Sequence, residues 1–352
     1  MRARGILPRH RPELTRGAAP GAVGYVISNP DGDDGDALTT YDIIGDAKSG
    51  SGLFALRGAE AFNFLCVPPL SRQDDVGLPA LLVALRLCRQ RQAMLLIDPP
   101  AAWSDAAAAI DGLRHWPLYS EDALMFYPRV LALDRLRARH EVFGSAAAAA
   151  GLMARLDQGG PVWSEHDKDE PLLCPALRTA ASATDLDQIR LAQAGVNLLQ
   201  PASVAPRSLT APRIRLRTLV AEGAARSDWR ELASRRLALL VINSIERGTR
   251  WVVYERPGPG LFARVHAQLT SFFQELEQQG AFAGRSAEEN YFVVCDERLN
   301  DAGQQAAGRF QLLFGIAASR AGDFQNWLVT HEPGGSSARA VSVNRYALPA
   351  QS

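Results

Sequence analysis

The chain has 352 residues, a length that predicts about two domains. It carries 38 Lys and Arg against 38 Asp and Glu, so its formal net charge is zero. This balance argues against nucleic acid as the main partner, because phosphate binding requires a basic surplus. Hydrophobic residues make up 47%, enough for a buried core. The low net charge also gives little self-repulsion, which suits a chain that packs against copies of itself.

No segment has the length and hydrophobicity of a transmembrane helix. The longest strongly apolar run covers only residues 237–242, whereas a bilayer span requires about 20 residues. The N-terminal stretch is rich in arginine but lacks the apolar region of a signal peptide. We therefore expect no direct membrane insertion, and we expect the chain to stay in the compartment where it is made.

The cysteines and histidines show no metal-binding or disulfide pattern. The four cysteines are far apart and form no CxxC pair, and Cys66 and Cys295 lie inside apolar runs. This arrangement predicts reduced, structural thiols. No two of the six histidines have the spacing of metal ligands. We therefore predict no metal site and no cofactor.

Residues 1–55 have the composition of a weakly structured N-terminal segment. A basic, proline-containing start leads to the short strand-like run 22–27. An acidic, glycine-rich stretch at 31–36 follows and predicts a solvated, flexible loop.

Residues 56–222 alternate between strand and helix patterns. The predicted strands are 62–67, 93–97, 123–127, 196–199 and 214–220. The predicted helices are 78–87, 104–113, 145–156 and 185–194, with Ser104 as the N-cap of the second. The segment 159–175 is predicted to be a loop. This alternation predicts an α/β domain, a mostly parallel sheet covered by helices on both faces.

Residues 223–332 predict a smaller α+β domain. Asp228 and Glu231 have the spacing of a capping box before a helix that ends at Gly248. A second amphipathic helix covers 261–276. The predicted strands are 250–255, 291–295, 310–317 and 324–331.

The last segment, 333–352, combines a linker with one more strand. Residues 333–337 are rich in glycine and serine, which is typical of a linker. The strand pattern beyond it consists of Ala340, Val341, Ser342, Val343, Asn344, Arg345 and Tyr346. Such a strand either pairs at the edge of its own sheet or acts as an arm that pairs with another chain.

No catalytic motif is present. The sequence lacks the nucleophile elbow, the phosphate-binding loop, the zinc-protease helix motif and the dinucleotide fingerprint. Asp98 follows a predicted strand, where catalytic groups of α/β proteins often lie, but the two prolines after it favour a rigid turn. We therefore predict that the chain is not an enzyme and has no catalytic residues.

From about residue 60 to 330 the chain resembles the contractile tail sheath protein family of myophage tails, R-type bacteriocins and phage-like injection systems. The N-terminal matches are NFLCVP at 63–68, MLLIDPP at 94–100, FYPR at 126–129, AGLMARLD at 150–157, GPVW at 160–163, AGVN at 194–197 and RTL at 217–219. The C-terminal matches are RRL at 235–237, TRWVVYE at 249–255, GAFAG at 280–284 and YFVVCD at 291–296. The segments follow the order of the family.

The resemblance implies mechanical work without chemistry. It implies a structural subunit that polymerises with itself, as hexameric rings or a helical lattice, around an inner tube protein, and that contracts to drive the tube through a target envelope. Baseplate and terminator proteins are further implied partners. Assembly is expected in the bacterial cytoplasm, followed by incorporation into a phage tail or phage-like injection particle.

Two arms are implied by the resemblance, each adding a strand to a neighbour's sheet. The candidate C-terminal arm is 340–346. The candidate N-terminal arm is Val23, Gly24, Tyr25, Val26 and Ile27. Two alternatives remain: an accessory sheath-like cap or baseplate adaptor, and an α/β hydrolase, against which the missing motifs count.

Overall fold

The structure, a computed structural model, describes residues 37–59, 61–72, 74–164, 173–174, 176–200, 216–221 and 229–342. The described residues from Thr40 onward belong to one compact unit. The predicted segments 22–27 and 31–36 lie outside the described residues. Among the helices described, none is long and apolar enough to cross a membrane.

Two short elements precede the first sheet. Helix α1 covers Thr40–Ile44, and a 3-10 helix, η2, covers Gly52–Gly58. Both fall in a stretch for which the sequence predicted only weak structure. Leu53 of η2 is buried and joins the core of the first sheet, so this stretch is held by packing.

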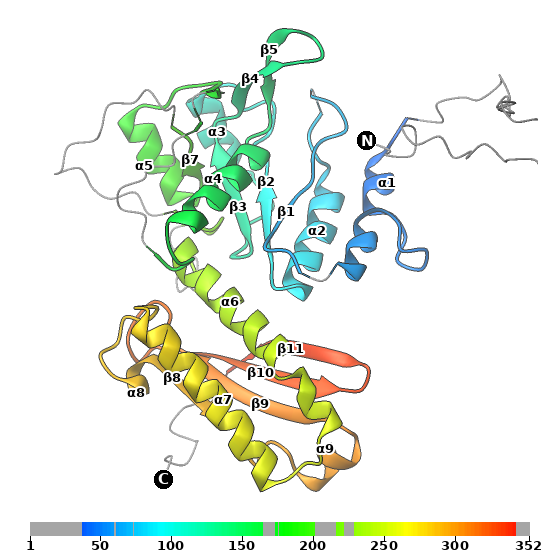
Figure 1. Ribbon diagram of the computed structural model, residues 1–352. Helices are drawn as coiled ribbons and strands as arrows, with labels where there is room; N and C mark the ends of the chain where they lie inside the picture. The colour runs from blue at the N-terminus through cyan, green and yellow to red at the C-terminus, as the bar shows by residue number, and fades with distance from the viewer. Residues whose placement is uncertain are drawn as a thin grey trace, which may run out of the picture. The chain divides into compact units, whose positions relative to one another are not determined.

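The first sheet is parallel and has the order β1-β2-β3-β7 (Figure 1). Its strands are β1 (Phe64–Cys66), β2 (Met94–Ile97), β3 (Ala123–Tyr127) and β7 (Asn197–Leu198). All four lie where strands were predicted. Every residue of β2 and β3 is buried, as expected for central strands with helices on both faces.

Helices cover the two faces of this sheet. On one face, α2 (Leu78–Gln90), α3 (Ala106–Leu113) and α5 (Asp185–Gln193) pack on Leu95 and Ile97 of β2. On the other, α4 (Ala146–Gly159) packs on Met94 and Leu96. The predicted Ser104 cap of α3 is wrong by one residue. Asp105 is the N-cap, because its side chain accepts a hydrogen bond from the backbone N–H of Ala108 at 2.9 Å.

A small antiparallel sheet, which was not predicted, adjoins the parallel one. It has the order β5-β4-β6, with β4 at Val130–Asp134, β5 at Arg139–Phe143 and β6 at Arg178–Thr179. Figure 1 shows the β4–β5 hairpin projecting beyond the parallel sheet. Charged residues interrupt the apolar pattern of this segment, so it lacks a clear strand signal.

The long helix α6 (Leu232–Gly248) leads into the second half of the unit. Glu231 is the N-cap residue of this helix, and its side chain makes no capping hydrogen bond. The capping box predicted from Asp228 and Glu231 would place Glu231 three residues after the N-cap, so the role predicted for Glu231 is wrong. Asp228 lies outside the described residues. Glu231 is extended because it bridges to Arg217. The strand predicted at 214–220 is reduced, within the described residues, to the isolated bridges of Arg217 and Leu219.

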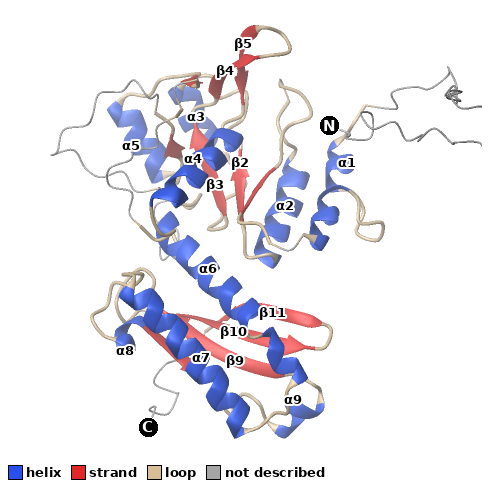
Figure 2. Ribbon diagram, viewed as in Figure 1, coloured by secondary structure: helices blue, strands red, loops and turns tan. Residues whose placement is uncertain are grey.

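The last sheet is antiparallel, with the order β11-β10-β9-β8 (Figure 2). Its strands are β8 (Tyr291–Val294), β9 (Phe310–Ile316), β10 (Gln325–Glu332) and β11 (Gly335–Val341). Helices α6 and α7 (Pro259–Gln278) bury apolar residues on one face, which includes Val293, Phe314 and Val329. Two short helices, α8 (Ala287–Asn290) and α9 (Ala302–Ala306), lie between the strands.

The strand predicted at 250–255 is wrong. Residues Arg250–Tyr254 form a 3-10 helix, η3, directly after α6. Only Val252 of η3 is buried, and Tyr254 is 91% exposed. The chain must turn from α6 into α7 here, and the helical turn buries one apolar side chain while keeping the connection short.

Two helical glycines should respond oppositely to alanine. A Cβ at Gly112 of α3 would collide with the indole of Trp103, which is buried, so we expect Gly112→Ala to cost about 1–3 kcal/mol. Gly151 of α4 is exposed with open space around it, so Gly151→Ala should stabilise by about 0.5–1 kcal/mol. Urea unfolding of both variants measures this, and equal effects would contradict the described packing.

Candidate assembly site

The C-terminal hairpin places β11 at the outer edge of the antiparallel sheet. Strand β10 turns at Pro333 and Gly334 into β11, and the ladder runs from Glu332–Gly335 to Asn326–Val341. Within the described residues, β11 pairs only with β10. Its other side therefore presents the unpaired backbone groups of an edge strand.

The register of the β10–β11 ladder indicates which residues of β11 direct their backbone N–H and C=O groups away from β10. In an antiparallel ladder, hydrogen-bonded and non-hydrogen-bonded pairs alternate. The two-residue turn makes Glu332–Gly335 a hydrogen-bonded pair, so the pairs that follow it alternate from there. The backbone N–H and C=O groups of Ser336, Ala338 and Ala340 therefore face away from β10.

A buried histidine fixes this hairpin to the end of α6. The His331 side chain of β10 has no solvent exposure. Its Nε2 lies 2.7 Å from Oγ1 of Thr249, and its Nδ1 lies 2.7 Å from Oγ of Ser336. The Thr249 hydroxyl donates to the carbonyl of Ile245 at 2.6 Å, so it accepts from Nε2–H. In the neutral ring Nδ1 is then the acceptor, and the Ser336 hydroxyl donates to it.

The surroundings of His331 oppose its protonation. Burial lowers the pKa of His331 to about 4, and the positive charge of Arg250 acts in the same direction. Protonation would also turn Nδ1 into a second donor, so the Ser336 hydroxyl would have to reverse its role and accept from Nδ1–H. The neutral ring therefore joins α6, β10 and β11 through two side-chain hydrogen bonds.

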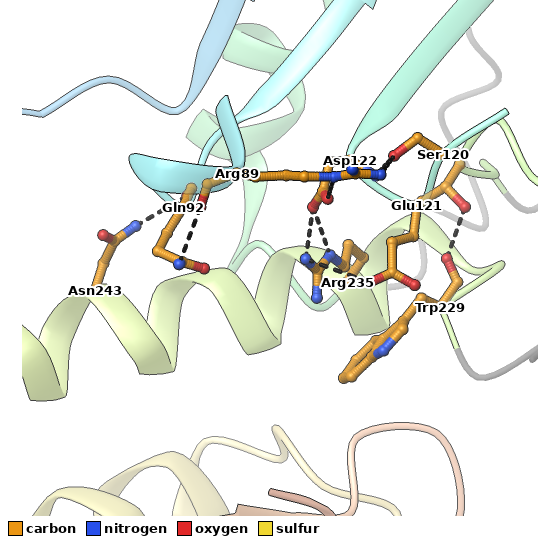
Figure 3. Close-up of polar contacts among 9 residues, drawn as sticks. Arg89, Gln92, Ser120, Glu121, Asp122, Trp229, Arg235 and Asn243 are labelled. Atoms are coloured by element: carbon orange, nitrogen blue, oxygen red, sulfur yellow. Dashed lines mark hydrogen bonds and ion pairs between the residues drawn. The ribbon is translucent and has the colours of Figure 1, made fainter. Parts of the chain in front are cut away.

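Helix α6 is held to the parallel-sheet half by a buried ion pair (Figure 3). The Arg235 guanidinium donates to Oδ1 of Asp122 from Nε at 3.1 Å and from a terminal nitrogen at 2.5 Å. Both side chains are under a tenth exposed. Arg89 of α2 donates to the other carboxylate oxygen at 3.2 Å, and Arg235 also lies over the Trp229 ring.

Two further contacts extend this attachment along α6. Arg236 donates two parallel hydrogen bonds of 2.7 Å each to the Asp157 carboxylate of α4. Asn243 donates to the backbone carbonyl of Gln92 at 3.1 Å, as Figure 3 shows. The apolar face of α6 is divided accordingly. Leu232 and Leu239 pack in the core that α6 shares with the parallel sheet. Five other residues pack in the core of the antiparallel sheet: Leu237, Ala238, Val241, Ile242 and Ile245.

The carboxyl edge of the parallel sheet has a small cavity of about 150 Å³. Its polar lining consists of Asp75, Asp98 and Arg129, with no hydroxyl, thiol or imidazole side chain among its lining residues. Asp98 accepts a hydrogen bond from the backbone N–H of Ala146 at 2.7 Å, and burial raises its pKa. Asp98 therefore fixes the start of α4, and we derive no reaction from this cavity.

The described cysteines are free, as the sequence predicted. Cys88 and Cys295 are buried, and burial raises the pKa of each thiol to about 12. Cys66 is partly buried and has a pKa of about 11 for the same reason. These thiols behave as apolar core groups.

The structure places only part of the two candidate arms. Ala340 and Val341 belong to β11 and pair with Trp327 and Asn326, which is the intramolecular pairing that the sequence left open. The stretch 333–337, expected as a linker, forms the hairpin turn and the start of β11 instead. Val343–Tyr346 and Val23–Ile27 lie outside the described residues.

Sequence reasoning missed the residues that hold the hairpin and α6. His331 was one of six histidines without the spacing of metal ligands. Arg235 lay in a segment that resembles the sheath family, and the sequence assigned it no role. The available signal was the pair of charged residues Arg235 and Arg236, which lies within the apolar part of the α6 sequence.

No protein-family model and no curated protein matches this chain. Solved structures do match. A chain of the contracted PVC sheath complex, from an extracellular contractile injection system, is 21% identical with a TM-score of 0.60, over 78% of this chain and 73% of that one. A chain of the 6-fold symmetrised anti-feeding prophage (AFP) baseplate is 21% identical with a TM-score of 0.54, over 75% and 67%. For the contracted AFP baseplate the values are 19%, 0.55, 77% and 72%.

These likenesses lie below 25% identity, so they establish the fold. The chain has the fold found in the sheath and baseplate complexes of contractile injection systems. The resemblance to the contractile tail sheath family is thereby confirmed at the level of the fold.

The Asp122–Arg235 pair should be costly to break. Asp122→Asn leaves the Arg235 charge buried without its main partner, so we expect a loss of about 3–5 kcal/mol in the free energy of unfolding. Asp111→Asn is the matched control, because Asp111 pairs with Arg114 where both side chains are mostly exposed, and it should cost under about 0.5 kcal/mol. Denaturant unfolding measures both, and equal costs would contradict the buried attachment.

His331 should make stability depend on pH. Its pKa of about 4 in the folded chain lies below the ordinary value of 6.5, so the unfolded chain binds a proton first as the pH falls. The contribution of His331 to the free energy of unfolding is therefore fully present above pH 6.5 and is lost as the pH falls from 6.5 to 4. The total loss is roughly 3 kcal/mol. His331→Gln should remove this part of the pH dependence in unfolding measurements. Parallel curves for variant and wild type would contradict the neutral, buried ring.

Proposed function

We propose that this chain is a structural subunit of a contractile injection particle, of the sheath type, that polymerises around an inner tube and contracts. The observation that carries the proposal is the open edge of β11, in a hairpin fixed by His331 and α6. The shared fold with sheath and baseplate complexes supports the same class.

Strand addition at β11 would supply the contact between subunits. Ser336, Ala338 and Ala340 offer three N–H and three C=O groups, so a partner strand could form up to six backbone hydrogen bonds. At about 1 kcal/mol net each, these contribute roughly 6 kcal/mol before ordering costs. One such contact is weak, and a lattice multiplies it. The candidate arm 23–27, and the part of the candidate arm 340–346 that follows β11, would act as the exchanged strands.

Contraction would be a repacking of subunits that each stay rigid. Helix α6 contributes side chains to the cores of both sheets, and Arg235 and Arg236 lock it to the parallel-sheet half. The movement would therefore occur between subunits, with the arms as hinges. The proposed partners are copies of this chain, the inner tube protein, and baseplate and terminator proteins. Assembly would take place in the bacterial cytoplasm.

A second candidate is an accessory cap or baseplate adaptor built on the same fold. The likeness to chains of two AFP baseplate structures favours it. An adaptor would bind sheath ends without forming long polymers, so the length of the assemblies distinguishes the two candidates.

Ala340→Pro tests the edge strand. Proline at this position removes an outward N–H and keeps the ladder bonds to β10, so the variant should fold with a wild-type unfolding midpoint and lose self-assembly in sedimentation. Ala340→Val is the control, because it keeps the N–H and the strand conformation, and it should assemble as the wild type does. A proline variant that folds and still assembles would contradict strand addition at β11.

A further inference from the structure

The β4–β5 hairpin has one packed face and one uncovered face. Because side chains alternate along a strand, Asp134, Glu141 and Phe143 lie on one side, where Arg72 pairs with both carboxylates and covers the Phe143 ring. Leu131, Leu133, His140 and Val142 lie on the opposite side.

This opposite side, together with the hairpin tip, is apolar and basic. Leu133 and Val142 are 53% and 42% exposed, and Leu136 at the tip is 91% exposed. Arg137 and Arg139 pair with Glu141 inside the hairpin. Arg178 of β6 pairs with Leu131 in the register of the two strands, so its side chain lies on the same side as Leu131. We call Leu133, Arg135, Leu136, Val142 and Arg178 the hairpin face. Three neighbouring exposed apolar side chains on a projecting hairpin are typical of a contact surface.

Helix α5 carries a surface of the complementary kind. Leu186 and Ile189 lie one turn apart and are 56% and 57% exposed. Asp185, one turn before Ile189, is also exposed. We call Asp185, Leu186 and Ile189 the α5 face.

Negative charge gathers at the start of α5. The hydrogen bond from the Thr184 hydroxyl holds the pKa of Asp187 below its ordinary value, so this carboxylate stays charged near neutral pH. Arg190, at the end of α5, offsets only part of this charge.

We propose that the hairpin face of one copy of this chain packs on the α5 face of the next copy. The leucines of one face and the leucine and isoleucine of the other would cover each other, and Arg135 would lie against the carboxylate of Asp185. Two different surfaces make a head-to-tail contact, which extends into rings or helices rather than closing as a dimer. This inference rests on the proposed function and adds a second lateral contact beside β11.

Cysteine cross-linking between two separate variants tests the contact. Leu136→Cys and Ile189→Cys are placed in different chains, both also carrying Cys174→Ser because Cys174 is exposed. Under assembly conditions, a short bismaleimide linker should give a covalent dimer when the two variants are mixed, and not with either variant alone. Linked pairs from Leu136→Cys alone would show that hairpins meet each other, and they would overturn the proposal, as would a mixture without dimers.

Charge exchange gives an independent test. Arg135→Glu and Asp185→Arg should each weaken self-association about tenfold, and the chain carrying both changes should recover most of the loss. Arg320→Glu makes the same change on an exposed loop residue elsewhere and should leave association unaltered. Single variants that associate like the wild type would overturn the hairpin contact alone. A wild-type chain that does not self-associate at all would overturn both this contact and the proposed function.

Discussion

The burial of helix α6 in two cores is the constraint on which the rest of the structure depends. Leu232 and Leu239 belong to the core beside the parallel sheet, while Leu237, Val241 and Ile245 belong to the core under the antiparallel sheet. Helix α6 therefore buries apolar side chains on two of its sides. Both sheets must therefore pack on it, and the halves of the unit are linked by hydrophobic burial rather than by a flexible connection.

Buried charge determines how α6 sits between these cores. An apolar helix face tolerates small rotations, whereas the Asp122 carboxylate must meet the Arg235 guanidinium, and Arg236 must meet Asp157. An unpaired buried charge is far more costly than a misplaced methyl group, so these pairs act against alternative packings. The neutral His331 ring acts in the same way at the far end of α6, where it connects Thr249 to the C-terminal hairpin.

The strands of the parallel sheet could be predicted because continuous apolar runs such as 94–97 have no other stable location than a doubly covered sheet. Other elements depend on tertiary contacts that local patterns do not encode. η3 has the composition of a strand but must connect two packed helices. The β4–β5 hairpin carries two carboxylates, Asp134 and Glu141, whose partner Arg72 lies 60 residues or more earlier in the chain. The edge strand was predicted at its C-terminal part, 340–341, and its turn was mistaken for a linker.

The central claim is that a rigid unit with an open edge strand forms a polymer. Electron microscopy of the purified full-length chain, with sedimentation over a range of concentrations, tests it most directly. The account predicts striated tubes or stacked rings that grow with concentration. A chain that remains monomeric at every concentration would contradict it.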